Sequence, residues 1–388
     1  MSSPDTITAS DRDHSGNWAV RQLTVADLRC WDRLTLQLDP GLVVVSGPNG
    51  AGKTSLVEAI CYGMVGVSPR TTREADAIRV GRQAFHVELH VDGPHGRQVR
   101  EMGYQPGLGR RMRIDEVPQR SVGLWRASGS ILVFLPEELR AVKGPPAARR
   151  RAIDRILEGT DSTFAATAAA YTAAVTQRNA MLKRIKGQVA GVAGLTPWDR
   201  AVAEHGAAVA TARSTMILDL QPRFARWMEE LGGGPGGTLA WEPSPADLGE
   251  MAPDRFHEHL DARLAANRTR DIQAAQTLSG PHRDDVWIGI GDQDLRRTGS
   301  QGEQRTAVLA LLLACRELLS EHGVTPILLL DDVLSELDPG RRRRLLDALV
   351  GQGQSWITSA DPDAADLAAA SGATHYLHVE DGHVAATP

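Results

Sequence analysis

A glycine-rich stretch that ends in lysine and threonine has the residue types and the spacing best suited to chemistry. The fixed positions of the pattern G-x-x-x-x-G-K-[ST] are all filled, by Gly47, Gly52, Lys53 and Thr54. In this pattern, backbone N–H groups surround the phosphates of a nucleotide at a helix N-terminus. The lysine reaches the β- and γ-phosphates, and the threonine hydroxyl ligates Mg²⁺. We therefore predict a nucleotide site with Mg²⁺ formed by Gly47, Pro48, Asn49, Gly50, Ala51, Gly52, Lys53, Thr54 and Ser55.

The residues on either side of this loop favour the same interpretation. The apolar run 42–45 is typical of a buried parallel strand, and residues 55–60 are good helix formers. A glycine-rich surface turn would explain neither flank. Lysine is also rare, with four lysines against 39 arginines, so a lysine at position 53 is unlikely to be incidental.

Two neighbouring carboxylates provide a second set of candidate residues. The apolar run 327–330 predicts a buried strand that ends in Asp331 and Asp332, with the sequence S-E-L-D following at 335–338. We expect Asp331 to hold Mg²⁺, directly or through water, and Asp332 to orient or deprotonate the attacking water. Helix capping could explain one of the two aspartates, but not both together with the acidic segment behind them.

A polar turn before an apolar helix is a second candidate anion site. Residues 298–306 contain two glycines and precede the helix predicted over 307–319. Unpaired N–H groups and the positive end of the helix dipole would point the same way there. The candidate residues in this turn are Ser300, Gly302 and Gln304.

Length and composition narrow the class of protein. A chain of 388 residues, 42% hydrophobic and 23% charged, can form two to three compact units. A formal net charge of −5 argues against nucleic-acid binding over the whole surface, so any DNA contact requires a local basic face. The three cysteines have no spacing for a zinc site or a disulfide framework. No apolar run is long enough to span a membrane, and we expect a cytoplasmic protein.

The pattern along the chain predicts an α/β protein with two lobes. Residues 1–17 are polar and are interpreted as a disordered tail without the features of a signal peptide. Residues 18–140 and 271–388 form lobe I, where alternating segments such as 34–38 and 85–91 predict antiparallel strands beside the parallel ones. Residues 141–270 form lobe II, which is largely helical and is interrupted by the glycine run 232–237.

The order of these features resembles the ATP-binding-cassette (ABC) superfamily, and within it the DNA-repair branch near the SMC proteins, most closely the RecF family. The resemblance covers about residues 20 to 360. Its markers are Gly47–Thr54, Pro136–Leu139, Lys143–Pro146, Arg149–Asp154, Gln177–Asn179, Pro197–Asp199, Gly280–Asp285, Ser300–Gln304 and Leu330–Asp338. Several of these markers are unrelated to generic ATP binding, which makes the resemblance specific.

The resemblance implies an ABC-type ATPase head with lobe II inserted between the phosphate loop and the signature turn. Ser300 and Gly302 of one subunit would contact the γ-phosphate of ATP held by the other. Two ATP molecules would then join a head-to-tail homodimer, and hydrolysis would release it. RecF-like proteins use such a clamp on duplex DNA near single-strand gaps, and act with RecO and RecR to help load RecA.

The family also implies that a basic surface holds the duplex through its phosphates. The arginines expected there are Arg110, Arg111, Arg113, Arg149, Arg150 and Arg151. Charge runs are often only solvent-exposed, so a solvated face is an equally weighted interpretation. The 149–151 cluster could also pair internally with acids such as Asp154.

Three departures from the superfamily pattern suggest that ATP hydrolysis is slow, and we expect this weak ATPase to be stimulated by DNA. No glutamine ends the strand predicted over 130–135, no histidine follows the strand in 355–359, and Asp332 stands where many cassettes have glutamate. Hydrolysis would then time the residence on DNA. Three alternatives remain open: the ATP-driving subunit of a membrane transporter, a nuclease-linked SMC-like ATPase, and a scaffold that binds ATP without hydrolysing it.

Overall fold

The structure is a computed structural model, and it describes residues 16–135, 139–161, 163–244, 246–361, 366, 369–370, 372, 375–380 and 382–387. Most of the predicted tail and the marker residues Pro136–Glu138 lie outside these ranges. The chain forms two compact units: Met1–Pro136 with Arg316–Pro388 (unit 1), and Glu137–Cys315 (unit 2). The predicted start of lobe II near residue 140 is close to this division, but residues 271–315 fall in unit 2.

A largely parallel sheet organises unit 1. Its order is β15-β14-β3-β13-β12-β8, and all neighbours run parallel except the β14–β15 hairpin. The central strands are apolar and buried, as expected for a parallel sheet covered on both faces. The strands are β3 (Leu42–Ser46), β8 (Ile131–Phe134), β12 (Ile327–Leu330), β13 (Ser355–Ser359), β14 (His375–Glu380) and β15 (His383–Thr387).

An antiparallel sheet is the second layer of unit 1. In β4 every second residue is buried, which is the alternation that predicted this strand. The sequence of residues 112–117 predicts one further strand of this sheet, but in the structure a turn at Asp115 and Glu116, both with positive φ, divides it into β6 and β7. The order is β2 (Trp31–Gln37), β1 (Ala19–Leu28), β4 (Phe85–Gly93), β5 (Gly96–Gln105), β6 (Gly109–Ile114) and β7 (Val117–Pro118).

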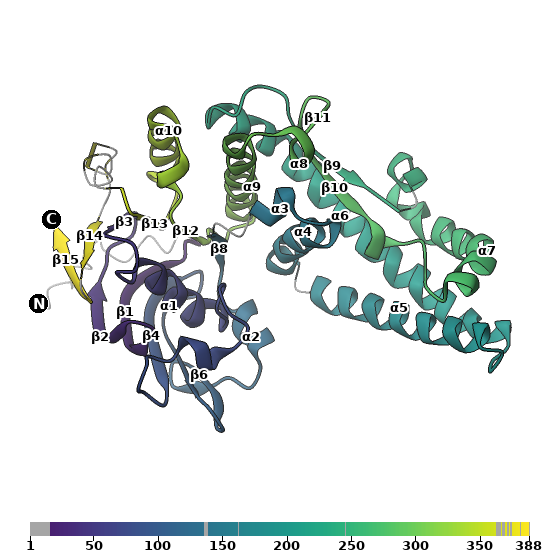
Figure 1. Cartoon of the computed structure of the whole chain (residues 1–388), viewed down its shortest axis with the longest axis horizontal. Helices are drawn as coiled ribbons and strands as arrows, with labels where there is room; N and C mark the ends of the chain where they lie inside the picture. Colours follow the sequence, from purple (N-terminus) through teal and green to yellow (C-terminus); the bar gives the residue numbers. More distant parts are fainter. Residues whose placement is uncertain are drawn as a thin grey trace, which may run out of the picture. The chain divides into compact units, whose positions relative to one another are not determined.

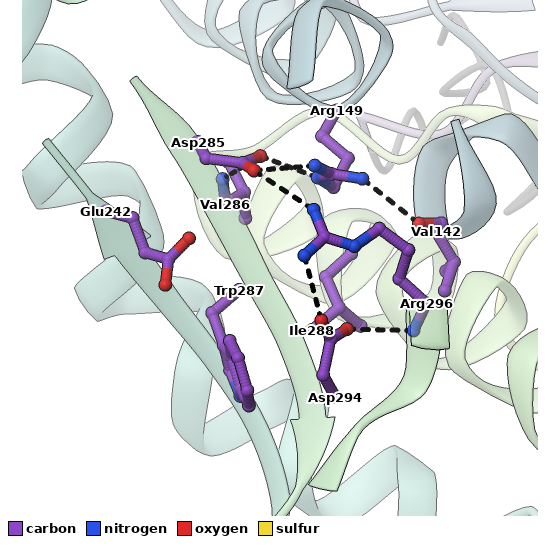
Figure 2. A pocket seen from close by; sticks show the side chains of 9 residues that line it. All are labelled: Val142, Arg149, Glu242, Asp285, Val286, Trp287, Ile288, Asp294 and Arg296. Atoms are coloured by element: carbon purple, nitrogen blue, oxygen red, sulfur yellow. Dashed lines mark hydrogen bonds and ion pairs between the residues drawn. The ribbon is translucent and has the colours of Figure 1, made fainter. Parts of the chain in front are cut away.

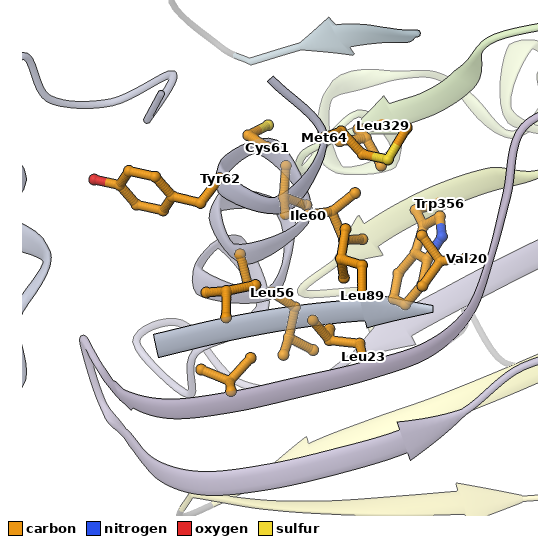
Figure 3. Packing of buried hydrophobic residues seen from close by; sticks show 14 of the residues in the cluster. Val20, Leu23, Leu56, Ile60, Cys61, Tyr62, Met64, Leu89, Leu329 and Trp356 are labelled. Atoms are coloured by element: carbon orange, nitrogen blue, oxygen red, sulfur yellow. The ribbon is translucent and has the colours of Figure 1, made fainter. Parts of the chain in front are cut away.

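Helix α1 (Lys53–Val65) joins the two sheets through one apolar core. Its Leu56 and Ile60 belong to the same buried cluster as Leu89 of the antiparallel sheet and Trp356 of the parallel sheet (Figure 3). The helix follows β3 and the glycine-rich loop, and it packs against the antiparallel sheet on one side and the parallel sheet on the other. The remaining elements of unit 1 are η1 (Glu74–Ala77), α2 (Val122–Ala127), η7 (Leu334–Glu336) and α10 (Pro339–Leu349).

Unit 2 is mainly helical, and in it α5 and α6 run side by side (Figure 1). Its helices are α3 (Arg140–Lys143), α4 (Pro146–Thr160), α5 (Phe164–Lys186), α6 (Thr196–Glu230), α7 (Phe256–Ala274), α8 (Leu295–Thr298) and the first part of α9 (Gln301–Glu321). Short 3₁₀ turns are η3 (Val192–Leu195), η4 (Ala246–Glu250), η5 (Pro253–Arg255) and η6 (Pro281–Arg283).

A three-stranded antiparallel sheet in unit 2 was only partly predicted. Strand β10 (Asp285–Ile290) pairs with β9 (Gly237–Glu242) along its whole length and with β11 (Gln293–Asp294). The segment 286–290 is strand-like in sequence and predicts β10. Strand β9 was not predicted, because a run of glycines precedes it. The pairing of β9 with β10 keeps residues after 271 in unit 2, so the division in the structure differs from the predicted boundary at 270.

Buried arginines hold the helices of unit 2 together. Arg178 of α5 is fully buried and donates to Asp199 of α6 at 2.7 Å and to Asp271 of α7 at 2.6 Å. Arg213 of α6 donates to both carboxylate oxygens of Asp154, at 2.8 and 2.9 Å. Three of the family markers, at 149–154, 177–179 and 197–199, therefore supply charged groups to the interior of this unit.

Candidate nucleotide site

The phosphate loop follows β3 and requires glycine at two positions. Gly47 has a φ of 143°, and a Cβ there would lie 2.0 Å from the carbonyl oxygen of Val379. Gly52 has a φ of 114°, and a Cβ there would lie 2.5 Å from Cys30 Sγ. The loop is thus packed between β14 and the turn that connects β1 to β2. A side chain at either glycine would displace the backbone N–H groups that surround phosphate.

Lys53 is the first residue of α1 and lies largely buried under the loop. Its Nζ donates to the carbonyl oxygens of Gly47 at 2.7 Å and Pro48 at 2.9 Å. Burial lowers the pKa of Lys53, and the negative charges of Asp332 and Asp331 oppose this shift. The ammonium group is therefore available to exchange two carbonyl contacts for phosphate oxygens, which are stronger acceptors.

Asp331 at the end of β12 meets the phosphate loop. Its carboxylate accepts hydrogen bonds from Thr54 Oγ1 at 2.9 Å and from Thr358 Oγ1 at 2.5 Å. Burial raises the pKa of Asp331, and the two hydroxyl donors partly oppose that shift. A buried carboxylate beside a threonine hydroxyl forms a set of hard oxygen donors that suits Mg²⁺. The predicted metal ligands Thr54 and Asp331 are thus in direct contact.

Asp332 has a strained backbone and an unsatisfied side chain. Its φ is 49°, and its N–H donates to Thr358 Oγ1 at 2.9 Å. Its Oδ1 is buried and has no hydrogen-bond partner within the described part of the chain. A left-handed backbone is uncommon at a non-glycine residue, and it also occurs in ordinary turns of this chain such as Asp115–Glu116, so the unpaired carboxylate oxygen is the more informative feature. An orphaned carboxylate oxygen next to the phosphate loop is suitable to accept a hydrogen bond from water.

A cluster of charges beside α1 was missed by the sequence analysis. Glu58 is fully buried, receives two hydrogen bonds of 2.8 Å from Arg29, and lies 3.9 Å from Arg70. Burial is the main influence on the pKa of Asp331 and raises it. The positive charge of Arg70 acts in the opposite direction and lowers that pKa. The sequence contained one indication of this cluster, because Glu58 stands among apolar residues of a predicted helix, and a buried glutamate needs a cationic partner.

In unit 2, Ser300 begins α9 with a capping box. Its N–H donates to Glu303 Oε2 at 2.7 Å, and Glu303 N–H donates back to Ser300 Oγ at 3.2 Å. Ser300 is exposed and Gly302 is partly exposed, as a phosphate contact requires. Gln304 is only 3% exposed, and its amide donates to the carbonyl oxygen of Leu295 at 2.6 Å. Gln304 therefore anchors the turn from inside, in contrast to its predicted contact with nucleotide.

The six candidate DNA-binding arginines have different surroundings. Arg111 and Arg151 are exposed, Arg113 is half-buried, and Arg110 pairs with Glu74. Arg150 is half-buried and donates to the carbonyl oxygen of Asp284. Arg149 is 3% exposed and forms a bidentate ion pair with Asp285, with both distances 2.6 Å. For Arg149 the structure supports the internal-pair alternative, although the partner is Asp285 and not Asp154.

The parallel sheet, the phosphate loop and the paired aspartates define an ATPase head of the ABC type. The model of an AAA domain matches residues 22–121. A DNA replication and repair protein RecF from Streptomyces avermitilis is 34% identical over 376 residues, which cover 94% of this chain and 99% of that protein. The protein of the same description from Acidothermus cellulolyticus is 36% identical over 376 residues, with the same coverage. This chain belongs to the RecF family.

Solved structures agree with this assignment. One of "the recombination mediator protein RecF-ATPrS in RecFOR pathway" has a TM-score of 0.82 and 27% identity, and covers 97% of this chain and 100% of that one. An SMC head bound to the C-terminal winged-helix domain of ScpA has a TM-score of 0.59 at 14% identity, covers 95% of this chain and 96% of that one, and shares the fold. The predicted fold class, an α/β ABC-type ATPase head with a mixed parallel and antiparallel sheet and a largely helical second lobe, is confirmed. No helix in the described ranges is long and apolar enough to cross a membrane.

Proposed function

We propose that this protein is an ATP-dependent clamp on DNA. Two copies would close head to tail around two ATP molecules, hold duplex DNA near single-strand gaps, and open when ATP is hydrolysed. Within this cycle the protein would act with RecO and RecR to promote the loading of RecA. Its place would be the cytoplasm, at the nucleoid.

The observation that carries the proposal is the unequal content of the two units. Unit 1 holds the phosphate loop, Lys53 and both aspartates, while the exposed Ser300 turn belongs to unit 2. We define the Ser300 turn as residues Gly299–Gly302. A γ-phosphate bound at Lys53 needs hydrogen-bond donors on its outer side, and the Ser300 turn of a second copy offers a hydroxyl, backbone N–H groups and a helix N-terminus. The relative described as RecF-ATPrS supports nucleotide binding by this family.

The chemistry assigned to unit 1 follows from its contacts. Lys53 would neutralise the β- and γ-phosphates after leaving the carbonyl groups of Gly47 and Pro48. Thr54 and Asp331 would hold Mg²⁺, which supplies charge stabilisation at the phosphates when bound. The unpaired Oδ1 of Asp332 would accept a hydrogen bond from the attacking water. This bond would orient the water in line with the γ-phosphate.

Hydrolysis is proposed to be weak, DNA-stimulated and slow, so that it limits the time spent on DNA. Asp332 is one methylene shorter than the glutamate of many cassettes, and no histidine lies at the end of β13, where Thr358 is hydrogen-bonded to Asp331. Positioning errors of this size reduce the rate of an in-line displacement. A turnover number in the range of typical enzymes, roughly 1–10³ s⁻¹, would contradict this part of the proposal.

The exposed arginines are the proposed contacts to the duplex. Arg111 and Arg113 lie on the same face of β6, because side chains two residues apart in a strand point the same way. Arg151 lies on the exposed side of α4. Contacts of this type bind phosphate and do not read sequence, so the affinity for duplex DNA should fall steeply as salt increases.

Sedimentation of the full chain, with and without ATP and duplex DNA, tests the proposal. We expect ATP to dimerise the wild type. Ser300→Arg should remain monomeric while binding ATP normally, because it blocks only the turn offered to the partner. Asp332→Asn should bind ATP and stay dimeric, since hydrolysis is lost. If Ser300→Arg dimerised like the wild type, a site shared between two copies would be excluded.

A further inference from the structure

The Ser300 turn depends on the short helix that precedes it. Helix α8 begins after Asp294, whose side chain accepts from the N–H of Arg296 at 2.9 Å. The buried amide of Gln304 reaches back from α9 to the carbonyl oxygen of Leu295. Gly299 allows this close return, because a Cβ there would lie 2.6 Å from that same carbonyl oxygen. The backbone that leads into Ser300 is therefore tied to α8, while Ser300 itself is bonded to Glu303 of α9.

Helix α8 is in turn attached to the rest of unit 2 by a chain of ion pairs (Figure 2). Arg296 pairs with Asp294 at 3.0 Å and with Asp285 of β10 at 3.5 Å. On its other side, Asp285 accepts two hydrogen bonds from Arg149 of α4, one at each carboxylate oxygen. Arg149 also donates to the carbonyl oxygens of Val142, in the last turn of α3, and of Gly144, at the start of the turn to α4. The chain thus runs from this turn, across β10, to the helix behind Ser300.

The two ends of this chain differ in burial, and that difference separates their roles. The side chain of Arg149 is 3% exposed, so its pair with Asp285 is a structural fixture whose disruption would leave a buried charge. The side chain of Arg296 is 40% exposed, and an ion pair with that much solvent contributes little to overall stability. The pair of Arg296 and Asp285 therefore adds little to stability, but it connects α8, which precedes the Ser300 turn, to a fixed carboxylate. Such a contact is suited to hold α8 in one position.

We propose that Arg149, Asp285 and Arg296 are positioning residues for the Ser300 turn. Arg149 fixes the Asp285 carboxylate, and Asp285 holds Arg296 so that α8 presents Ser300 in the orientation a γ-phosphate of the second copy requires. The marker Gly280–Asp285 supplies the central carboxylate. The inference rests on the proposed function only for its effect on dimerisation. The expected effect of these residues on how often the Ser300 turn opens does not depend on ATP.

The test uses Arg296→Gln in the full chain, with Arg268→Gln as the matched control. Arg268 of α7 pairs with Asp199 at 2.8 Å, its side chain is 36% exposed, and it also belongs to unit 2. Both substitutions remove one partly exposed guanidinium, which pairs with Asp285 and Asp294 in the first case and with Asp199 in the control. Hydrogen exchange of the nucleotide-free protein measures how often the turn opens, since the Ser300 N–H is protected by its bond to Glu303. Sedimentation with ATP measures dimerisation, and titration with ATP measures binding by the monomer.

In Arg296→Gln we expect amides 300–304 to exchange about tenfold faster and the ATP-induced dimer to dissociate about tenfold more readily, with unchanged ATP binding by the monomer. In Arg268→Gln these amides should keep the wild-type exchange rate. Unchanged exchange at 300–304 in Arg296→Gln would overturn the inference. If the exchange rose as expected but the wild type never dimerised with ATP, the proposed function would fail while the positioning role held.

Discussion

The phosphate loop of unit 1 and the Ser300 turn of unit 2 are supported very differently. The loop is packed at Gly47 against β14 and at Gly52 against the β1–β2 turn, and hydrogen bonds join Thr54 to the end of β12. The Ser300 turn is exposed and depends on a four-residue helix and one chain of ion pairs. The loop proposed to bind nucleotide is therefore packed on both sides, whereas the turn proposed to face a second copy is held by a few replaceable contacts.

Arg149→Met is expected to have the largest effect, because it removes the buried cation at the centre of the ion pairs behind the Ser300 turn. The carboxylate of Asp285 would lose its bidentate partner, and breaking a buried pair in this way typically costs about 3–5 kcal/mol. Urea unfolding followed by circular dichroism should show a clear loss of stability. Arg151→Met, two positions along the same helix and exposed, should stay within about 0.5 kcal/mol of the wild type.

The same two variants separate structural from DNA-binding arginines. At temperatures where both are folded, Arg151→Met should bind duplex DNA more weakly and lower the salt dependence by about one phosphate contact. Arg149→Met should keep the wild-type salt dependence. Wild-type stability of Arg149→Met would mean that the ion pair with Asp285 does not support unit 2, and the contrast between the two regions would lose its basis.

Lys53→Met should have the next largest effect and should act on binding instead of folding. Within the described part of the chain the ammonium group donates to two carbonyl oxygens of its own loop, so we expect little change in stability. Loss of charge-assisted hydrogen bonds to phosphate should weaken ATP binding about 100-fold, which is roughly 3 kcal/mol. Fluorescence titration with an ATP analogue measures this, and the exposed Lys143→Met is the control. Retained affinity in Lys53→Met would show that the loop is not the nucleotide site.

The contrast between the regions also explains what could be predicted from the sequence. The phosphate loop is a run of consecutive residues between a strand and a helix, so its pattern alone located Lys53 and Thr54. Asp331 was predictable because a buried strand that ends in acids is a local feature. The pair of Arg149 and Asp285 was not, since 136 residues separate the partners and a basic run gives no sign of which side chain is buried.

Two further errors have a similar physical origin. Gln304 lies in a helix of mixed character, and only the return of its amide to Leu295 shows that it points inward. Strand β9 starts directly after a run of glycines, and its pairing with β10 depends on a contact that local periodicity does not record. Side chains whose role depends on a distant partner are therefore the ones that sequence patterns misplace.

Asp331→Asn should have the smallest effect and the most informative dependence on pH. Burial raises the pKa of Asp331 above its ordinary value of 3.8, so between the unfolded and folded pKa values the folded chain retains a proton that the unfolded chain has lost. The unfolding free energy of the wild type therefore falls as pH rises through that window, by about 1.4 kcal/mol for each unit of pKa elevation. Removing the charge should stabilise the nucleotide-free protein at pH 7 and have no effect near pH 3.

Thermal unfolding at the two pH values measures this difference, with an expected rise at pH 7 of about 2 °C. The exposed Asp338, whose pKa is lowered mainly by the N–H of Arg341, is the control of opposite sign, and Asp338→Asn should not raise the melting temperature at pH 7. Adding Mg²⁺ and ATP should reverse the order, because only the wild-type carboxylate gains a cation. If Asp331→Asn were less stable than the wild type at pH 7 without nucleotide, the carboxylate would not be strained in the empty site, and unit 1 would lack the preformed cation site that distinguishes it from unit 2.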